Sequence, residues 1–574
     1  MAAAASVEFS RDGSDLIENI EQHLQAQYPG RWGRLPQPEL ERRPFRGATA
    51  GWRIELDPQT LRIGGVDHLV ATIDPHFPNS QPTVFAPQAG KDFRWPHVEG
   101  NTKLCLIATR CAADPGVRVL DHLVAAMELL RFSDEKCENE FRREFLAYWK
   151  QRATVSEDRK QCLSIVKPKG PSRQIVCYFD AEGRIIFGED RECLVRWLRN
   201  RGRNPSHKEI VPSCLLRLSR PWIPGAYPEL GQDVIKLMSE EILRGVITAG
   251  RPAPLLIEVT TATGPGFAAV VLEGAKEKHL SKGFRHIARV PHQRIVESFA
   301  ARPVQRIPVA RADGVWIHGR DHNRAYFELV TKKVAIVGCG SVGAAVALLL
   351  AQAGVGELLL VDSDILTTAN VGRHPLGLNH VGWNKASALS WVLRRRYPHL
   401  CFDAVFQTRF EELARPDREK LAGADLIVTA GIDFDGETAL DAWRIGLPRP
   451  PALVSTWVEA FAAAGHAALL YGTQSIQPAF DESERPAFQL TDWPEDTGAL
   501  IVEAGCGNVF QPHGVIDLHP TVGMAAGLVV DALTGKVTES CRRYWLGDRA
   551  KVIESGGTPR QDFDESRVLR AVPW

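Results

Sequence analysis

The spacing of apolar residues divides the chain into three parts. In the first, helical spacing at residues 14–27 predicts a helix, and apolar runs at 52–56 and 68–73 predict strands. A turn-rich stretch follows at 75–100, and helical spacing returns at 119–130 and 134–151. We therefore predict an α+β domain over residues 1–153.

A polar joint, KPKGPSR at 167–173, lies near the start of the second part. The run 174–187, with DAEGR at its centre, predicts a hairpin, and 255–259 and 268–272 predict strands. This part carries no chemical motif. We predict a mixed α/β linker domain over residues 154–315 and assign it no role.

In the third part, residues 316–574, apolar strands alternate with amphipathic helices, which is typical of a parallel sheet. The most apolar run, 334–361, has the length of a membrane span. Five glycines interrupt it and Asp362 follows it. It therefore predicts strand, helix and strand, and the chain as a whole is assigned to the α/β class.

Composition narrows the possible partners. Lys plus Arg and Asp plus Glu both number 69, so no basic surface predicts nucleic-acid binding. The first twenty residues carry no basic start followed by an apolar stretch, as a secretory signal would. None of the eleven cysteines forms a Cys-x-x-Cys pair, which argues against a disulfide framework and a four-cysteine zinc site. We expect a cytoplasmic protein with no nucleic-acid partner, no membrane partner and no zinc.

A glycine-rich turn in the third part predicts a nucleotide site. Gly338-x-Gly340-x-x-Gly343 follows a predicted buried strand and opens a helix, and Asp362 ends the next strand. The glycines permit a tight turn and close approach of phosphate, and the helix N-terminus favours an anion. The carboxylate can accept hydrogen bonds from a ribose. This pattern alone fits dinucleotide dehydrogenases as well as enzymes that use ATP.

The residues after that strand separate the two possibilities. Asp362-x-Asp364, Asn370-x-x-Arg373 and a Gly-x-x-Lys ending at Lys385 follow in order. This set resembles the ThiF-type and ubiquitin-activating superfamily. Arg and Lys can neutralise the charge that develops on a leaving pyrophosphate. The resemblance implies a Rossmann-like adenylation domain over residues 316–574 that binds ATP and Mg²⁺, with Arg373 and Lys385 as catalytic residues.

The same resemblance assigns further residues. Asp433 follows the next apolar strand, where the superfamily holds its Mg²⁺-binding aspartate, although Asp435 is equally placed by sequence. Arg320 matches an arginine that reaches the ATP site of a dimer partner, which implies a homodimer; an exposed loop arginine is the alternative. Cys506, between two glycines, lies where thioester-forming relatives carry a cysteine, and an inert loop cysteine is the alternative.

The first part resembles a ubiquitin-conjugating enzyme over about 140 residues. His97 stands eight residues before Cys105, Pro115 stands ten after it, and a leucine-rich helix follows. The resemblance implies that Cys105 carries a thioester. Val98 and Glu99 replace the proline and asparagine of the family's His-Pro-Asn motif. His97 itself can be structural or chemical.

Together the two resemblances match bacterial fused activating and conjugating enzymes, such as those of CBASS antiphage operons. They imply activation of a protein C-terminal carboxylate, thioester capture and transfer to an amine of a target protein. The cargo is either a cyclic-oligonucleotide synthase or a ubiquitin-like protein with a flexible tail. Two other functions remain open: an adenylyltransferase that activates a sulfur carrier, and a scaffold with an inactive conjugating fold.

Overall fold

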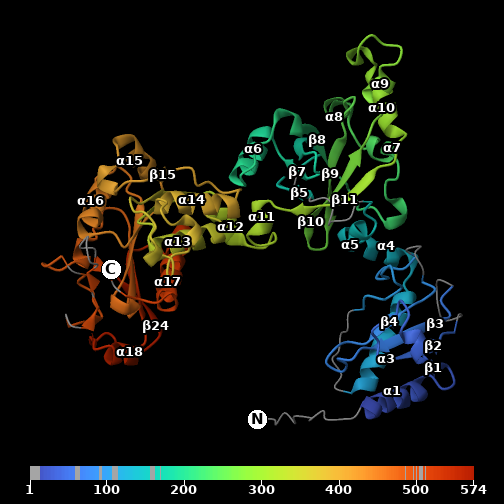
Figure 1. Cartoon of the computed structure of the whole chain (residues 1–574), viewed down its shortest axis with the longest axis horizontal. Helices are drawn as coiled ribbons and strands as arrows, with labels where there is room; N and C mark the ends of the chain where they lie inside the picture. Colours follow the sequence, from blue (N-terminus) through green and yellow to red (C-terminus); the bar gives the residue numbers. More distant parts are fainter. Residues whose placement is uncertain are drawn as a thin grey trace. The chain divides into compact units, whose positions relative to one another are not determined.

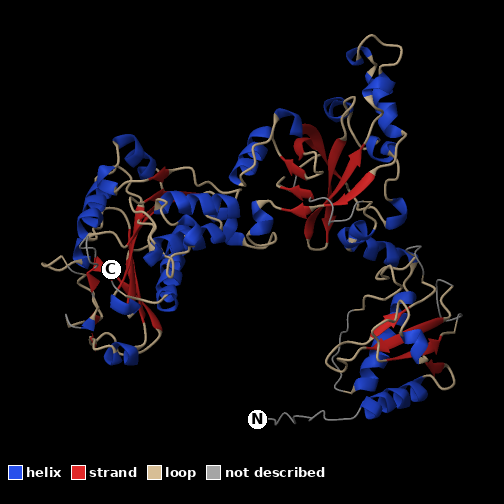
Figure 2. Cartoon of the chain, in the orientation of Figure 1, coloured by secondary structure: helices blue, strands red, loops and turns tan. Residues whose placement is uncertain are grey.

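The computed structural model comprises two compact units. Figures 1 and 2 draw the whole chain. The structure describes residues 13–57, 65–89, 94–106, 114–154, 162–168, 170–484, 486–494, 497–499, 501–502, 509–510 and 512–574. Unit 1 comprises Met1–Lys160, Pro168–Gln174 and Ser213–Val309, and unit 2 comprises Gln161–Lys167, Ile175–Pro212 and Ala310–Trp574.

Unit 1 begins with a helix and an antiparallel sheet. Its first elements are α1 (Gly13–Gln27), β1 (Trp32–Arg34), α2 (Gln37–Leu40), β2 (Ala50–Glu55), β3 (His68–Ile73) and β4 (Thr83–Phe85), with the strands in the order β1-β2-β3-β4. α3 (Pro115–Leu130), α4 (Asp134–Arg143) and α5 (Phe145–Gln151) follow. Ile20 of α1 and Leu123 of α3 pack into one core with Trp52 of β2. The predicted strands are confirmed, but the single predicted helix over 134–151 is wrong: it breaks at Glu144, which has φ −104° and ψ 27°.

The rest of unit 1 extends that core with a second sheet. Its elements are β8 (Ile210–Arg217), most of which belongs here, α7 (Gly231–Ile235), α8 (Glu240–Val246), β9 (Ala253–Thr261), β10 (Gly264–Leu272), α9 (Glu277–Leu280), α10 (His292–Ala300) and β11 (Gln305–Pro308). β8 to β11 form the order β11-β10-β9-β8. Trp149 of α5 stacks on Trp222 and donates a 2.9 Å hydrogen bond to the Ile307 carbonyl. The conjugating-like fold therefore shares its core with residues 213–309.

Unit 2 begins with four strands in the order β6-β7-β5-β12, and α6 (Arg191–Asn200) follows β7 in the chain. The strands are β5 (Cys162–Ser164), β6 (Arg173–Phe179), β7 (Ile185–Gly188) and β12 (Ala310–Arg311). β6 and β7 pair antiparallel, which confirms the hairpin predicted around DAEGR. The predicted linker residues 154–315 thus contribute to both units, and the division into three domains remains a prediction.

The main sheet of unit 2 has the order β15-β14-β13-β16-β17-β18-β22-β24. Its strands are β13 (Lys333–Val337), β14 (Glu357–Val361), β15 (Val405–Phe406), β16 (Leu426–Ala430), β17 (Ala452–Val458), β18 (Ala464–Leu470), β22 (Cys541–Leu546) and β24 (Val568–Pro573). The five strands from β15 to β17 are parallel, and β18, β22 and β24 are antiparallel. This parallel half has the strand order of a Rossmann-like sheet, as predicted.

Helices cover both faces of this sheet (Figures 1 and 2). One face meets α13 (Ser341–Ala353), α14 (Lys385–Arg396) and α17 (Val515–Leu533), and the other meets α15 (Arg415–Ala422) and α16 (Phe434–Ile445). Alternate residues of one strand serve the two faces: Ile336 packs toward α13, whereas Val337 packs on the other side. Both faces are buried, which explains the continuous apolar strands of the sequence.

Shorter elements complete unit 2 and the loops of both units. They are α11 (Gly314–Ile317), α12 (Arg324–Leu329), α18 (Arg549–Glu554), β19 (Thr491–Asp492), β20 (Ile501–Val502), β21 (Val509–Phe510) and β23 (Thr558–Pro559). The 3₁₀ turns are His207–Glu209, Pro224–Ala226, Ile287–Arg289, Thr368–Asn370, Leu378–His380, Phe410–Glu412, Ala460–Ala462 and Gln477–Ala479.

Two apolar segments resemble membrane spans by composition. The run 334–361 folds as β13, α13 and β14, as predicted. In the part of the chain that the structure describes, α17 is the one helix with the length and hydropathy of a span. Leu518, Val522 and Val529 of α17 lie in the core against the sheet and α13. Packing in the protein interior accounts for the apolar character of α17.

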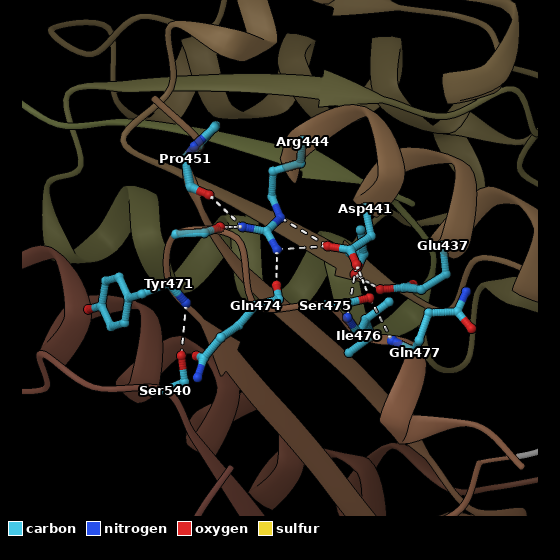
Figure 3. A network of polar contacts seen from close by, with 12 residues as sticks. Glu437, Asp441, Arg444, Pro451, Tyr471, Gln474, Ser475, Ile476, Gln477 and Ser540 are labelled. Carbon is cyan, nitrogen blue, oxygen red and sulfur yellow. Dashed lines mark hydrogen bonds and ion pairs between the residues drawn. The ribbon is translucent and has the colours of Figure 1, made fainter. Parts of the chain in front are cut away.

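A buried ionic network fixes the C-terminal half of α16 (Figure 3). Arg444 is fully buried, and its guanidinium donates to the Asp441 carboxylate at 2.8 Å and to the Gly472 carbonyl at 2.7 Å. It also donates to the carbonyls of Pro451 and Gln474. The second Asp441 oxygen accepts hydrogen bonds of 2.8 Å from Ser475 and from the Ile476 N–H. The network ties α16 to the loop that follows β18.

Glu437, on the same helix, should make the free energy of unfolding depend on pH. Burial raises its pKa from 4.5 to about 7, and hydrogen bonds from Thr429 and Ser455 oppose the rise. Because the folded-state pKa exceeds the unfolded value, the folded state binds the extra proton, and stability falls as pH rises between the two values. Between about pH 5 and about pH 8 the wild type should lose up to about 3 kcal/mol relative to Glu437→Gln. The free energies of unfolding are measured in urea at both pH values. An equal change in the two proteins between these pH values would contradict the prediction.

Candidate functional site

The glycine-rich turn lies in a groove at the carboxyl ends of the parallel strands, beside neighbouring strands β13 and β16. The groove has a volume of about 320 Å³. Strand order reverses between β13 and β16, which is where open α/β sheets bind their ligands. The lining includes Gly338, Gly340, Asp362, Asp364, Lys385, Thr408, Arg409, Gly431 and Asp433.

Each glycine of the turn has a distinct steric role. Gly338 has φ +90°, and a Cβ there would lie 2.4 Å from the Ala430 carbonyl oxygen. A Cβ on Gly343 would lie 1.8 Å from the carbonyl oxygen of Gly338, so helix α13 can approach the turn only without a side chain. A Cβ on Gly340 would meet no atom within 4 Å. The open space at Gly340 is where a ligand can contact the backbone.

Asp362 connects the glycine turn to the segment that follows β14. One carboxylate oxygen accepts a 2.6 Å hydrogen bond from the Cys339 N–H, and the other accepts a 2.7 Å bond from the Asp364 N–H. Burial raises the pKa of this carboxyl, and the two backbone donors oppose the rise. A carboxylate oxygen can accept more than one hydrogen bond, so a ribose hydroxyl can still bind Asp362.

Lys385 lies at the first position of α14. Its Nζ is 2.8 Å from Asp364 Oδ2, and its side chain is 12% exposed. Asn384 caps the helix and donates a 2.7 Å hydrogen bond to the Asp362 carbonyl. The structure therefore brings together three residues that the sequence predicted for ATP: Asp362, Asp364 and Lys385.

Asn370 and Arg373 do not line this groove in the structure. The Asn370 side chain instead accepts a 3.0 Å hydrogen bond from the Thr367 N–H. Next to Arg373 stands His374, a residue that the sequence interpretation missed. His374 Nδ1 accepts a 3.2 Å bond from the Leu376 N–H, so Nε2 is the nitrogen that donates to the Cys339 carbonyl at 2.8 Å.

His374 thus joins the Arg373 segment to the glycine turn. Burial lowers its pKa, the bond to the Cys339 carbonyl opposes this, and the positive charges of Lys385 and Arg373 add to the lowering. No sequence signal distinguished His374 apart from its place beside Arg373.

Asp433, the predicted Mg²⁺ ligand, lies in the groove as the N-cap of α16. Its Oδ1 accepts a 2.9 Å bond from the Gly436 N–H, and its Oδ2 is 2.6 Å from the guanidinium of Arg409. Asp435, the other candidate, is not among the lining residues. Arg409 is a second residue that the sequence interpretation missed, and the charge of Asp433 raises its pKa.

Two predicted residues lie elsewhere. Arg320 lies in the turn after α11 with φ 49° and does not line the groove of its own chain. Cys506 lies outside the described residues. Cys339 is fully buried, and burial raises the pKa of its thiol far above the usual value, as expected of a packing residue.

A second groove, in unit 1, contains Cys105. It has a volume of about 590 Å³, and its lining includes His97, Cys105, Glu128, Arg131, Lys136, Glu140 and Arg143. Cys105 is exposed, whereas burial raises the pKa of the nearby Cys137 thiol to about 11. Among the cysteines that the structure describes, Cys105 is the exposed one, whereas Cys193, Cys401 and Cys541 are half-buried and the others are buried.

The backbone of Cys105 is held by His97. The Cys105 N–H donates a 2.8 Å bond to the His97 carbonyl, and the His97 N–H donates a 2.6 Å bond to the Tyr148 hydroxyl. His97 has φ 60°, an uncommon conformation for a residue with a side chain. Its ring Nε2 is 3.5 Å from Glu140 and its Nδ1 is 3.8 Å from Glu144. Ligand atoms of these three residues lie within 4.8 Å of one another, so the His97 ring and the two carboxylates form one cluster.

Family comparisons match the two parts of the chain that contain these grooves. Residues 322–539 match the ThiF family, and residues 37–157 match the Prokaryotic E2 family B. The chain joins a ThiF-family domain to a prokaryotic conjugating-enzyme-like domain. This confirms the fused architecture inferred from the sequence. The second match extends to residue 157 and so includes Cys105, α4 and α5.

Individual relatives cover the chain only in part. The ATP-dependent ubiquitin transferase-like protein Cap2 of Pseudomonas aeruginosa is 28% identical over 261 residues, 44% of this chain and 45% of that protein. The chain therefore spans less than half the length of this relative. Ubiquitin-like modifier-activating enzyme 5 of Xenopus laevis is 26% identical over 294 residues, 49% of this chain and 67% of that protein. The crystal structure of E. coli MccB with AMPCPP and the MccA peptide shows 15% identity and a TM-score of 0.29, covering 43% of this chain and 66% of that one.

Proposed function

We propose that the chain uses ATP to activate a protein C-terminal carboxylate, captures it as a thioester and transfers it to an amine of a target protein. The observation that carries this proposal is the convergence of Asp362, Asp364 and Lys385 on a glycine turn, in a chain that also presents an exposed Cys105. The named similarity to Cap2 supports the same combination of steps.

Adenylation needs positioning and charge more than a nucleophile from the enzyme. The cargo carboxylate attacks the α-phosphorus of ATP, and pyrophosphate leaves. In the proposed site Gly340 and the N-terminus of α13 face the phosphates, Asp362 binds the ribose, and Lys385 neutralises charge on the leaving group. Mg²⁺ would neutralise charge on the phosphates, and Asp433 supplies the oxygen ligand that this ion prefers.

For Arg373 to contact ATP, its segment must move toward the groove. It lies outside the lining of the groove, in a segment that His374 fastens to the turn. We propose that Arg373 and Asn370 approach the phosphates when ATP binds. Arg320 acts in the ATP site of a second copy of the chain, because it does not line its own; the active form is then a homodimer.

The cargo is proposed to be a protein with a flexible C-terminal tail, either a cyclic-oligonucleotide synthase or a ubiquitin-like protein. By likeness to Cap2 and by the sequence resemblance to fused enzymes of antiphage operons, we place the reaction in cytoplasmic antiviral defence. The similarity to a ubiquitin-like modifier-activating enzyme is compatible with either cargo. Activation of a sulfur carrier would leave Cys105 without a role, and an inactive scaffold would leave the Lys385–Asp364 pair without one.

Replacement of the two predicted catalytic cations, Lys385 in the groove and Arg373 outside its lining, tests the proposal. Lys385→Ala and Arg373→Ala should each lower ATP–pyrophosphate exchange at least about tenfold, since each removes a full charge opposite phosphate. The assay uses the proteins encoded by neighbouring genes as candidate cargo. Lys536→Ala removes a lysine that is 66% exposed and should leave exchange unchanged. Unchanged exchange in both site variants would refute the assignment of this groove to ATP.

A further inference from the structure

One wall of the Cys105 groove carries a buried carboxylate oxygen that lacks a hydrogen-bond donor. Glu140 lies on α4, and its side chain is 18% exposed. Its Oε1 is 3.3 Å from the Arg143 guanidinium. Its Oε2 is buried and, within the part of the chain that the structure describes, accepts no hydrogen bond. An unsatisfied buried acceptor is unfavourable, so a ligand that brings a donor to this oxygen is stabilised there.

His97 connects this Glu140 oxygen to the backbone of Cys105. His97 lies 3.5 Å from Glu140 Oε2 through its ring, and its carbonyl accepts the hydrogen bond of the Cys105 N–H. The His97 backbone is fixed in turn by the Tyr148 hydroxyl. Cys105 and Glu140 both line the groove, so a molecule bound in the groove can contact both.

Tyr148 cannot act as a base here. Burial raises its pKa to about 12, the bond from His97 opposes this, and the negative charges of Glu144, Cys105 and Glu140 add to the rise. Of the other acids, Glu128 lines the groove but is exposed to water, and Glu144 does not line it. Three cations, Arg131, Lys136 and Arg143, share the lining. Glu140 is therefore the shielded acceptor next to His97, the residue that holds the Cys105 backbone.

We propose that Glu140 is a catalytic carboxylate for aminolysis at Cys105: it accepts a hydrogen bond from the incoming primary amine and takes the proton that the amine loses. This rests on the proposed function. The amine nitrogen attacks the thioester carbonyl carbon, a C–N bond forms, the C–S bond breaks, and Cys105 leaves as a thiolate. The proton goes from nitrogen to Glu140 and then to water, so the step needs no other reactant.

The test isolates discharge from activation. The full-length protein is charged at Cys105 by exchange with a synthetic peptide α-thioester, which needs no ATP, and Cys105→Ala serves as the blank. Discharge to free lysine is followed in a single turnover. Glu140→Gln should charge normally and discharge about a hundredfold more slowly near pH 7. Glu138→Gln, on the same helix and 45% exposed, should discharge like the wild type, and Glu140→Asp should recover part of the rate.

The dependence on pH and on the amine distinguishes a proton acceptor from a structural residue. The deficit of Glu140→Gln should shrink as pH rises, because hydroxide then removes the proton. It should also be smaller with hydroxylamine, because the nitrogen of this weakly basic amine loses its proton to water more readily once it has attacked. Equal rates for the two proteins, or a deficit independent of pH and amine, would overturn the proposal. A wild-type Cys105 that exchanges no acyl group with the thioester would overturn it as well.

The inference and the proposed function can fail separately. If Glu140 controls discharge of the peptide but ATP and candidate cargo never charge Cys105, the activating function is refuted and the role of Glu140 stands. If ATP charges Cys105 and discharge is indifferent to Glu140, only the present inference is refuted.

Discussion

The Cys105→Ala variant is expected to retain ATP–pyrophosphate exchange and to form no conjugate. The loss should be complete, because a methyl group cannot form a thioester. Exchange should persist because the nucleotide groove consists of residues 337–436 and includes none from the conjugating-like part. A thioester resists water yet reacts readily with amines, so capture on a thiol separates a difficult transfer into two easier steps.

Non-reducing gels with ATP and candidate cargo provide the measurement. The wild type should show an adduct that a thiol reductant removes, together with a resistant product. Cys137→Ala is the matched control, since Cys137 is buried in the same domain and should not carry cargo. A resistant product formed by Cys105→Ala would show that transfer does not pass through this residue.

The order of the two cysteines follows from the same gels. We expect cargo to pass from the adenylate to Cys506 and then to Cys105. Cys105→Ala should then retain a reducible adduct on Cys506, whereas Cys506→Ala should form adenylate and load neither cysteine. Cys105 loaded in the Cys506→Ala protein would instead indicate direct transfer from the adenylate.

The sequence predicted the nucleotide groove well because its chemistry is local. Gly338, Gly340, Gly343, Asp362 and Lys385 belong to one strand–helix–strand unit and the next helix, where spacing alone determines position. Arg409 was missed because it reaches the groove from a loop about 24 residues before Asp433 in the chain, through an ion pair that no local spacing encodes.

In the Cys105 groove, by contrast, the sequence predicted only part of the site. The offset between His97 and Cys105 identified the thiol, since the two residues belong to one short hairpin. Glu140 and Tyr148 come from helices that start about 30 to 40 residues later, and they meet His97 only because α4 and α5 turn at Glu144. That turn was also the helix boundary that periodicity failed to predict, because both segments keep helical spacing across it.

The Arg444→Met variant is expected to destabilise the ThiF domain by about 3–5 kcal/mol. Removal of the guanidinium leaves the Asp441 carboxylate buried without its cation and deprives the Pro451, Gly472 and Gln474 carbonyls of their donor. Methionine fills much of the volume but donates nothing. Calorimetry should show a lower unfolding temperature for the transition that ATP raises in the wild type.

The matched control is Arg415→Met. Arg415 is 91% exposed and pairs with Glu419 one helical turn away, so its loss should change stability by less than about 0.5 kcal/mol. The effect of Arg444→Met should also reach the nucleotide groove, because Asp433 caps the first turn of α16 and the ionic network fixes the other end of the same helix. Weaker stabilisation by ATP with Mg²⁺ than in the wild type would support that link. An unfolding temperature within the range of the Arg415→Met protein would show that the three carbonyls find other donors and that the network does not anchor α16.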